Sequence, residues 1–206
     1  MIIMIIIGLT GPSGAGKTTL CEIAKAMKIE SINADEVYHR LLVPPSPCLD
    51  EIVINFGDKI LNSDKTLNRA ALASVVFADG ENDKLSLLNR ITHKYVKDEF
   101  NRIISKMEKS GVFAVLVDAP TLFESGYDKD CDFTISIIAK ETLRRERIVS
   151  RDELSYDKAD QRLSAQKDDQ FFKDRSDYVL NNDGDIAELS KNFSHILKQR
   201  GGFDEN

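Results

Sequence analysis

Residues 11–18, which read GPSGAGKT, have the spacing of a phosphate-binding loop. They match the pattern G-x-x-x-x-G-K-[ST] at every fixed position. Glycines let the backbone wrap closely around an anion, so that successive N–H groups point at it, and the N-terminus of a following helix adds its dipole. The pattern predicts a nucleotide site built on Gly11, Ser13, Gly14, Ala15, Gly16, Lys17, Thr18 and Thr19.

Two side chains of this loop suit phosphate chemistry. The ammonium group of Lys17 can bind the β and γ phosphates of ATP, and the Thr18 hydroxyl can ligate Mg²⁺. The alternative is a fortuitous glycine-rich turn that carries a solvated lysine. A cation in the first turn of a helix is unfavourable against the helix dipole unless an anion lies nearby, which favours the phosphate site. We therefore expect ATP and Mg²⁺ as cofactors.

The rest of the sequence favours a small-molecule kinase over other proteins with such a loop. A GTPase normally carries an N-K-x-D guanine motif, which this sequence lacks. An ABC-type ATPase would need a signature motif and an acidic pair after its third strand, whereas Asp118 is followed by Ala119 and Pro120. Asp118 is a second choice for holding Mg²⁺ through water, and the alternative is a plain carboxylate at a strand end.

Asp35 is the candidate for engaging an acceptor hydroxyl group. It follows a short predicted strand at 29–33, and ligands of open α/β sheets bind at the carboxyl ends of the strands. We therefore expect Asp35 to lie across from the phosphate loop, where it could accept the hydroxyl proton or bind a water of Mg²⁺. A carboxylate at the N-terminus of a helix is an equally good interpretation, and both stay open.

Three arginines could compensate the charge of the transferred phosphoryl group. Arg144, Arg147 and Arg151 are three and four residues apart, so they share one helix face. Segment 140–151 has five basic and two acidic residues, a net charge of 5 − 2 = +3. A mobile arginine face that closes over the γ-phosphate would also exclude water. The alternative is a solvated face with internal ion pairs.

Composition describes an ordinary globular chain of 206 residues, of which 42% are apolar and 30% charged. The net charge of −6 argues against a generally basic nucleic-acid-binding surface. The three cysteines form no Cys-x-x-Cys pair, so we expect neither a disulfide framework nor a zinc site, and a cytoplasmic location. The apolar run before Gly8 has only seven residues, which is too short to span a membrane.

The apolar pattern predicts alternating strands and helices. We expect strands at 2–8, 29–33, 112–118, 133–139 and 178–180. We expect helices at 18–27, 35–42, 49–56, 68–78, 83–109 and 186–199, with further charged helices within 140–176. This order predicts an α/β fold, a three-layer sandwich with a five-stranded parallel sheet covered on both faces. The all-helical stretch between the second and third strands predicts an inserted lobe, and 140–176 a lid.

Several segments together resemble one family, the dephospho-coenzyme A kinases, over about residues 5–185. They are Gly-Leu-Thr-Gly at 8–11, Asn-Ala-Asp at 33–35, Leu-Asn-Arg at 67–69 with Val76-Phe77, Leu-Asn-Arg-Ile-Thr-His at 88–93, Pro-Thr-Leu-Phe-Glu at 120–124, Arg151-Asp152, Ala165-Gln166 and Arg-Ser-Asp-Tyr-Val-Leu-Asn-Asn at 175–182. The phosphate loop is generic, but the ordered set is specific to this family.

The resemblance implies transfer of the γ-phosphoryl group of ATP to the ribose 3′-hydroxyl of dephospho-coenzyme A. Asp35 would be the base, and Arg69 and Arg151 would face anionic groups of the substrates. His93, by itself typical of helix packing or of the surface, would lie near the acceptor pocket. We further assign Arg147 to ATP binding and Arg151 to catalysis.

The resemblance also implies an organisation of the chain. Residues 1–206 would form a single kinase domain, with a helical acceptor-binding insertion at about 43–110 and a lid at about 140–176. The partner would be the small-molecule acceptor rather than nucleic acid or a membrane, and we expect a monomer or a weak homo-oligomer.

The sequence departs from the family at four positions. Asn33 stands in place of the first aspartate of the triplet, so no carboxylate is required there. Asn68 replaces the aspartate before Arg69, Lys94 stands where a proline often follows the histidine, and Thr121 replaces a leucine.

Two other functions stay open from the sequence. One is a nucleoside or nucleotide kinase of the same fold, which would phosphorylate free nucleosides or monophosphates. The other is a regulatory ATP-binding protein that transfers no phosphate.

Overall fold

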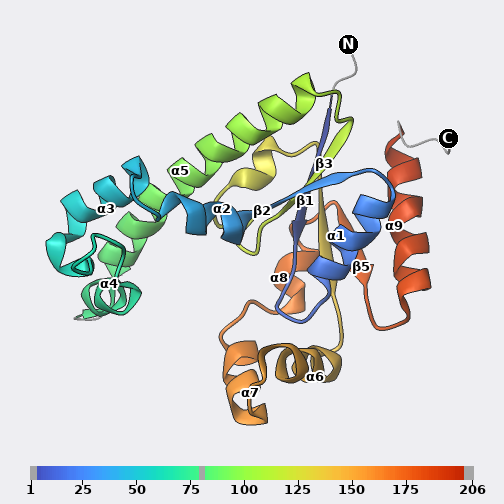
Figure 1. The fold of residues 1–206 in the computed structure, drawn as a ribbon. Helices are drawn as coiled ribbons and strands as arrows, with labels where there is room; N and C mark the ends of the chain where they lie inside the picture. The colour runs from blue at the N-terminus through green and yellow to red at the C-terminus, as the bar shows by residue number, and fades with distance from the viewer. Residues whose placement is uncertain (1–3, 79–81, 202–206) are drawn as a thin grey trace. The chain divides into compact units, whose positions relative to one another are not determined.

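The structure of the chain, a computed structural model, describes residues 4–78 and 82–201 (Figure 1). Those residues divide into two compact units. The first unit combines the chain up to Ser31 with the chain from Val112 onward, and the second unit is Ile32–Gly111. The predicted start of the first strand at residues 2–3 lies outside the described residues.

The first unit contains the sheet and the phosphate loop. Its elements are β1 (Ile5–Thr10), α1 (Lys17–Ala26), β3 (Ala114–Asp118), the 3₁₀ helix η3 (Tyr127–Asp130), β4 (Phe133–Ile138), α6 (Glu141–Asp152), α7 (Tyr156–Ser164), α8 (Asp169–Lys173), β5 (Tyr178–Asn181) and α9 (Ile186–Arg200). Strand β2 (Glu30–Asn33) crosses the boundary between the units.

The five strands form one sheet in the order β2-β3-β1-β4-β5, which confirms the predicted five-stranded α/β fold. Strand β1 pairs in parallel with both β3 and β4, and β4 pairs in parallel with β5. The prediction that β1 ends at Gly8 is wrong. The ladder continues because Leu9 pairs with Asp118 and Thr10 with Ser136, so the strand extends to the edge of the phosphate loop.

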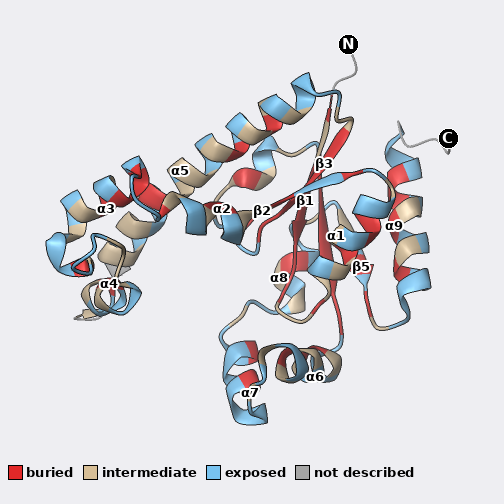
Figure 2. Ribbon diagram, viewed as in Figure 1, coloured by how far each residue is buried: buried red, intermediate tan, exposed pale blue. Residues whose placement is uncertain are grey.

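One face of the sheet is covered by α1 and α9. Side chains alternate along a strand, and Ile7 and Leu9 of β1 share this face with Leu20 of α1 and Phe193 of α9 in one buried core. All four side chains are fully buried. Figure 2 shows that β3 and β4 are buried along their whole length and β1 from Ile7 onward, as expected of a parallel sheet covered on both sides.

The opposite face meets the segment after β3 and helix α8. Gly8 points this way, and a Cβ atom there would lie 2.9 Å from Leu122 Cδ2 and 3.0 Å from Cys131 Sγ. The Ser136 hydroxyl shares a hydrogen bond with the hydroxyl of Ser176, which follows α8. Both faces are therefore covered, and the carboxyl ends of the strands are left to carry the site.

The charged stretch at 140–176, predicted to contain several helices, forms three: α6, α7 and α8. Helices α6 and α7 pack on a small core of Ile148, Ala159 and Leu163. Helix α6 ends at Asp152, and its C-cap Glu153 takes a left-handed conformation with φ 52°. Because this core is small, most side chains of the two helices are free to take part in polar contacts.

The second unit is helical. Its elements are α2 (Ala34–Leu41), α3 (Pro47–Phe56), the 3₁₀ helix η1 (Asp58–Ile60), α4 (Arg69–Val76) and α5 (Asn82–Lys109). They enclose a separate core of Leu42, Cys48, Ile52, Ile60, Leu72, Val76 and Ile91. Gly57 caps the end of α3 with φ 84° and donates its N–H to Val53 O at 2.8 Å.

Within residues 4–78 and 82–201, no helix has the length and apolar character needed to cross a membrane. All three cysteines lie in the described part of the chain, and each is a free thiol.

Candidate nucleotide-binding and phosphoryl-transfer site

The phosphate loop connects β1 to α1 at the carboxyl edge of the sheet. Its three glycines all take positive φ: 140° at Gly11, 77° at Gly14 and 111° at Gly16. A Cβ atom at Gly11 would lie 2.1 Å from Ile137 O, and one at Gly14 would lie 2.6 Å from Arg144 O. Glycine is therefore required at these positions both by the backbone conformation and by the closeness of the neighbouring backbone.

The end of the loop presents the N-terminus of α1. Gly16 is the N-cap of this helix in a left-handed conformation, and no side chain caps it. The N–H groups of the first helical turn have no acceptor within the helix, so with the helix dipole they attract an anion. Thr18, in this turn, is exposed. The Lys17 ammonium group donates to Gly11 O at 2.7 Å, which holds its charge over the loop.

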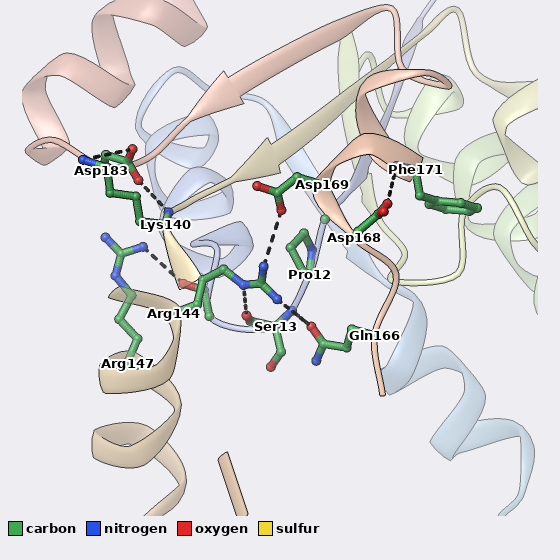
Figure 3. Close-up of polar contacts among 12 residues, drawn as sticks. Pro12, Ser13, Lys140, Arg144, Arg147, Gln166, Asp168, Asp169, Phe171 and Asp183 are labelled. Carbon is green, nitrogen blue, oxygen red and sulfur yellow. Dashed lines mark hydrogen bonds and ion pairs between the residues drawn. The ribbon is translucent and has the colours of Figure 1, made fainter. Parts of the chain in front are cut away.

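The carbonyl side of the loop is held by Asn182 and by Arg147, the second of which is labelled in Figure 3. Asn182 is 7% exposed, and its side-chain amide donates to Ala15 O at 2.7 Å. Arg147 donates to Gly14 O at 3.2 Å and to Asn182 O at 3.1 Å. These contacts fix the carbonyl side of the loop, and the N–H groups at the start of α1 are left to face an anion.

The start of the loop is held by Arg144 and Gln166. Arg144, which is 5% exposed, donates to Ser13 O at 3.1 Å and pairs with Asp169 at 3.4 Å. Burial lowers the pKa of its guanidinium group from the ordinary 12.5, and the nearby carboxylates of Asp169 and Glu141 act in the other direction. The Ser13 N–H donates to Gln166 Oε1 at 2.9 Å.

Arg151 lies at the end of α6, close to the loop. Its guanidinium group donates twice to Asp152, at 2.7 and 2.9 Å, and its Nη2 lies 3.4 Å from Ser13 Oγ. Arg162 of α7 also donates to Asp152. Hydrogen bonds from Arg151, supported by the charge of Arg162, lower the pKa of Asp152 to about 2. The carboxylate therefore stays ionised at neutral pH and keeps both arginines in place.

The loop arginines differ from the solvated face that the sequence left open. Arg144 is buried, and Arg144, Arg147 and Arg151 all contact residues of the phosphate loop. Arg144 and Arg147 donate to main-chain oxygens of the loop, so these two arginines hold the loop itself. Arg151 instead contacts the Ser13 hydroxyl. Only Arg151, whose side chain is 55% exposed, is placed at the open side.

Asp118 ends β3, which contacts α1, and pairs with Leu9 of β1 at the edge of the loop. Burial and the charge of Asp118 together raise the pKa of the Cys21 thiol of α1 to about 12, and the charge of Lys17 acts in the other direction. Asp118 is 7% exposed. The carboxylate oxygens of Asp118 and the Thr18 hydroxyl are both ligands that Mg²⁺ prefers.

The loop offers few side-chain ligands for a metal, which suits a magnesium ion that is bound mainly by nucleotide phosphates and water. No group of three or more His, Cys, Asp or Glu side chains is arranged to hold a metal in the part of the chain that the structure describes. Mg²⁺ usually keeps several waters and is shared between one or two protein ligands and the phosphates of its substrate. Thr18 and Asp118 fit that arrangement.

Asp35 belongs to the second unit, in the first turn of α2, and is exposed. The cap of this helix is Asn33, whose side-chain oxygen accepts the Glu36 N–H at 3.0 Å. Asp35 therefore does not serve as the N-cap of α2. Its carboxylate is open to solvent in the first turn of this helix.

Arg69 and His93 also lie in the second unit. Arg69 begins α4, after Asn68, whose side chain accepts the Ala71 N–H at 2.9 Å. The guanidinium Nη1 of Arg69 is 3.3 Å from His39 Nε2, so Arg69 and His39 form an exposed polar pair. His93 is partly buried on the long helix α5.

The structure thus brings together part of the predicted site. The loop residues, Arg147 and Arg151 are neighbours in the first unit, whereas Asp35, Arg69 and His93 are carried by the second unit. Spacing in the sequence did not reveal Asn182, Gln166 or Arg162 as contacts of this site. Gln166 and Asn182 lie in the family-like segments 165–166 and 175–182, and this resemblance was the only indication of them in the sequence. The residue types of these segments do not by themselves indicate a chemical role.

A phosphate loop between the first strand and first helix of a parallel sheet, backed by arginines from a helical segment after β4, defines a P-loop kinase. A sequence model of the dephospho-CoA kinases matches residues 5–188. The chain is 33% identical over 196 residues to the dephospho-CoA kinase of Corynebacterium efficiens, covering 95% of this chain and 97% of that protein.

Solved structures agree with this match. The dephospho-CoA kinase from Campylobacter jejuni is similar with a TM-score of 0.66 and 26% identity, over 95% of this chain and 96% of that one. Protein TT1252 from Thermus thermophilus is similar with a TM-score of 0.79 and 26% identity, over 97% of this chain and 99% of that one. The chain belongs to the dephospho-CoA kinase family.

Membership confirms the resemblance, the P-loop kinase fold and the enzyme class that the sequence predicted. It also implies that the chain binds ATP and acts on a small-molecule acceptor.

Replacing Gly16 by alanine tests whether the loop depends on this glycine. The new Cβ atom would lie 2.1 Å from Asn182 Nδ2, so the loop or its contact to Ala15 O must move. We expect Gly16→Ala to weaken ADP binding about a hundredfold, as measured by calorimetric titration. The main-chain N–H groups at the start of α1 would no longer point at the phosphates.

Gly126→Ala is the matched control. Gly126 also has a positive φ, 72°, but a Cβ atom there has nothing within 4 Å. We expect it to cost about 1 kcal/mol of stability and to leave ADP affinity unchanged. Equal ADP affinities for Gly16→Ala and the parent would contradict this account of the loop.

Proposed function

We propose that this chain transfers the γ-phosphoryl group of ATP to the ribose 3′-hydroxyl of dephospho-CoA, giving CoA and ADP. The observation that carries the proposal is the preorganised phosphate loop in a chain of the dephospho-CoA kinase family. Phosphoryl transfer needs little covalent chemistry from the protein. It needs the two substrates positioned and the phosphoryl charge stabilised.

The nucleotide half of the reaction is assigned to the first unit. The N–H groups at the start of α1 bind the phosphates, and Lys17 turns its ammonium group from the loop carbonyls to the β and γ phosphates. Gly11, Ser13, Gly14, Ala15, Gly16 and Thr19 complete the loop and its first turn. Arg147 supports ATP binding by holding the loop from behind.

Mg²⁺ is proposed as the metal of the reaction. The Thr18 hydroxyl would ligate it directly, and Asp118 would hold it through water. When bound, the ion neutralises charge that develops on the phosphate oxygens. The exposed position of Thr18 and the oxygen ligands of both side chains support this assignment.

The acceptor half of the reaction is assigned to the second unit. Asp35 would accept the proton of the ribose hydroxyl, and its support is an exposed carboxylate that has no capping role in α2. Arg69 would bind an anionic group of dephospho-CoA, and His93 would lie near the acceptor. We therefore propose residues 43–110 as the acceptor-binding insertion.

Residues 140–176 are proposed as the lid of the single kinase domain. Arg151 is its catalytic residue, because its guanidinium group is exposed at the open side of the loop and held by the ionised Asp152. Such a cation can stabilise the transferring phosphoryl group and, when the lid closes, help to exclude water.

We further propose a cytoplasmic enzyme that is a monomer or a weak homo-oligomer. The three free cysteines suit a reducing compartment. The proposed partner is dephospho-CoA, with neither nucleic acid nor a membrane.

An acceptor assay tests this function directly. Purified enzyme with ATP and Mg²⁺ is offered dephospho-CoA, adenosine or simple nucleoside monophosphates, and the phosphorylated product is identified by mass. We expect the dephospho-CoA product alone, with a phosphate on its ribose 3′-hydroxyl. Phosphate on adenosine or on a monophosphate instead would favour a nucleoside or nucleotide kinase, and ADP without any phosphorylated acceptor would favour a regulatory ATP-binding protein.

The role of Asp35 predicts a separation of turnover from nucleotide binding. Asp35→Asn removes the proton acceptor and keeps the size of the side chain, so we expect kcat to fall about a hundredfold or more. The KM for ATP should change less than about twofold. Glu36→Gln, the adjacent exposed carboxylate, is the control and should keep full turnover. Full turnover in Asp35→Asn would remove this residue from the chemistry.

The role of Arg151 predicts a slower transfer step. Arg151→Ala removes a cation from the open side of the loop, and we expect single-turnover transfer to slow at least about tenfold. Lys158→Ala removes an exposed cation from α7 and should leave the rate unchanged. An unchanged transfer rate in Arg151→Ala would return this residue to a solvated surface role.

A further inference from the structure

Ser13 is held at three points by residues that lie more than 130 positions further along the chain. Its N–H donates to Gln166 Oε1 at 2.9 Å, its carbonyl accepts from Arg144 Nε at 3.1 Å, and its hydroxyl lies 3.4 Å from Arg151 Nη2. Figure 3 shows Arg144 and Gln166 on the two sides of the Ser13 main chain. Ala15 also has both main-chain groups bonded, but its N–H donates to the nearby Pro12 O rather than to a distant side chain.

These contacts close into a ring. Gln166 Oε1 accepts from the Ser13 N–H and also from Arg144 Nη2, at 3.2 Å, while Arg144 Nε returns to Ser13 O. Arg144 is itself fixed by burial and by Asp169. A closed ring of hydrogen bonds between rigid groups removes rotational freedom of the peptide units on either side of Ser13.

The chemistry of Gln166 suits this position. The Ser13 N–H needs an acceptor, and the amide oxygen supplies one without adding a negative charge beside a triphosphate site. Binding this N–H to the protein also keeps it from the phosphates, so the anion is left to the N–H groups at the start of α1. Preorganised donors cost no reorganisation when the ligand arrives.

We propose that Gln166 is a positioning residue for ATP, acting through the Ser13 main chain to aim the phosphate loop. Gln166 does not touch the nucleotide. Its effect is on ATP affinity rather than on the acceptor, because the ring closes on the loop alone. The inference rests on the proposed function only in taking ATP as the ligand of this loop.

The test replaces Gln166 by methionine, which has a similar length and no oxygen. We expect the KM for ATP and the Kd for ADP to rise about tenfold, since the loop loses one hydrogen-bond acceptor and its fixed geometry. The KM for dephospho-CoA should stay within about twofold, because nothing on the acceptor side changes. A residue that only stabilised the fold would not raise the KM for ATP while leaving the KM for dephospho-CoA unchanged.

Gln161→Met is the matched control, since Gln161 is an exposed glutamine of α7. Hydrogen exchange of the peptide that covers residues 10–19 provides a second measurement. Exchange should be faster in Gln166→Met than in the parent and unchanged in Gln161→Met. If Gln166→Met does not fold, Gln166→Asn carries the same expectation, because its shorter side chain withdraws the oxygen from Ser13 but keeps an amide.

Three results would overturn the proposal. They are unchanged ADP affinity in folded Gln166→Met, an equal rise in the KM values for both substrates, and unchanged exchange of residues 10–19. A parent enzyme that phosphorylates no dephospho-CoA would instead contradict the proposed function, and the ADP titration would still decide the role of Gln166.

Discussion

The site depends on exposing main-chain N–H groups to an anion in a loop that has no side-chain cap. A main-chain N–H or C=O group without a hydrogen-bond partner costs free energy when it is buried. A loop with three positive-φ glycines also has little stiffness of its own. The protein solves both problems on the carbonyl side. Asn182, Arg147 and Arg144 bind the oxygens of Ala15, Gly14 and Ser13, so the loop is fixed through its carbonyl groups while the N–H groups at the start of α1 stay available.

This arrangement explains why a charged segment with little apolar content is folded at all. Helices α6 and α7 bury only a small core, yet α6 carries two arginines that hold the loop and a third at its open side. The ionised Asp152 fixes that third arginine together with Arg162, and its low pKa makes the contact independent of pH through the neutral range. The contacts that stabilise α6 and α7 are therefore the same contacts that hold the phosphate loop in its binding conformation.

Much of the fold could be predicted from sequence, because apolar strands and the glycine pattern are local signals. The same holds for the loop residues and for the alternation of elements. Asn33 and Asn68, which depart from the family's aspartates, both cap helices, and asparagine caps as well as aspartate does. The contacts of Asn182 and Gln166 could not be predicted, because they join residues 167 and 153 positions apart and follow from packing rather than spacing. The end of β1 was missed for a similar reason, since only the ladder to β3 and β4 shows that it continues past Gly8.

The most direct measurement of the central claim is a crystal structure with Mg²⁺ and an ATP analogue that cannot be hydrolysed. The account predicts that the β-phosphate accepts hydrogen bonds from main-chain N–H groups between Gly14 and Thr18, while the carbonyl oxygens of the loop keep their contacts to Asn182 and Arg147. A triphosphate bound elsewhere on the chain, or one held by side chains alone with the loop N–H groups turned away, would contradict it.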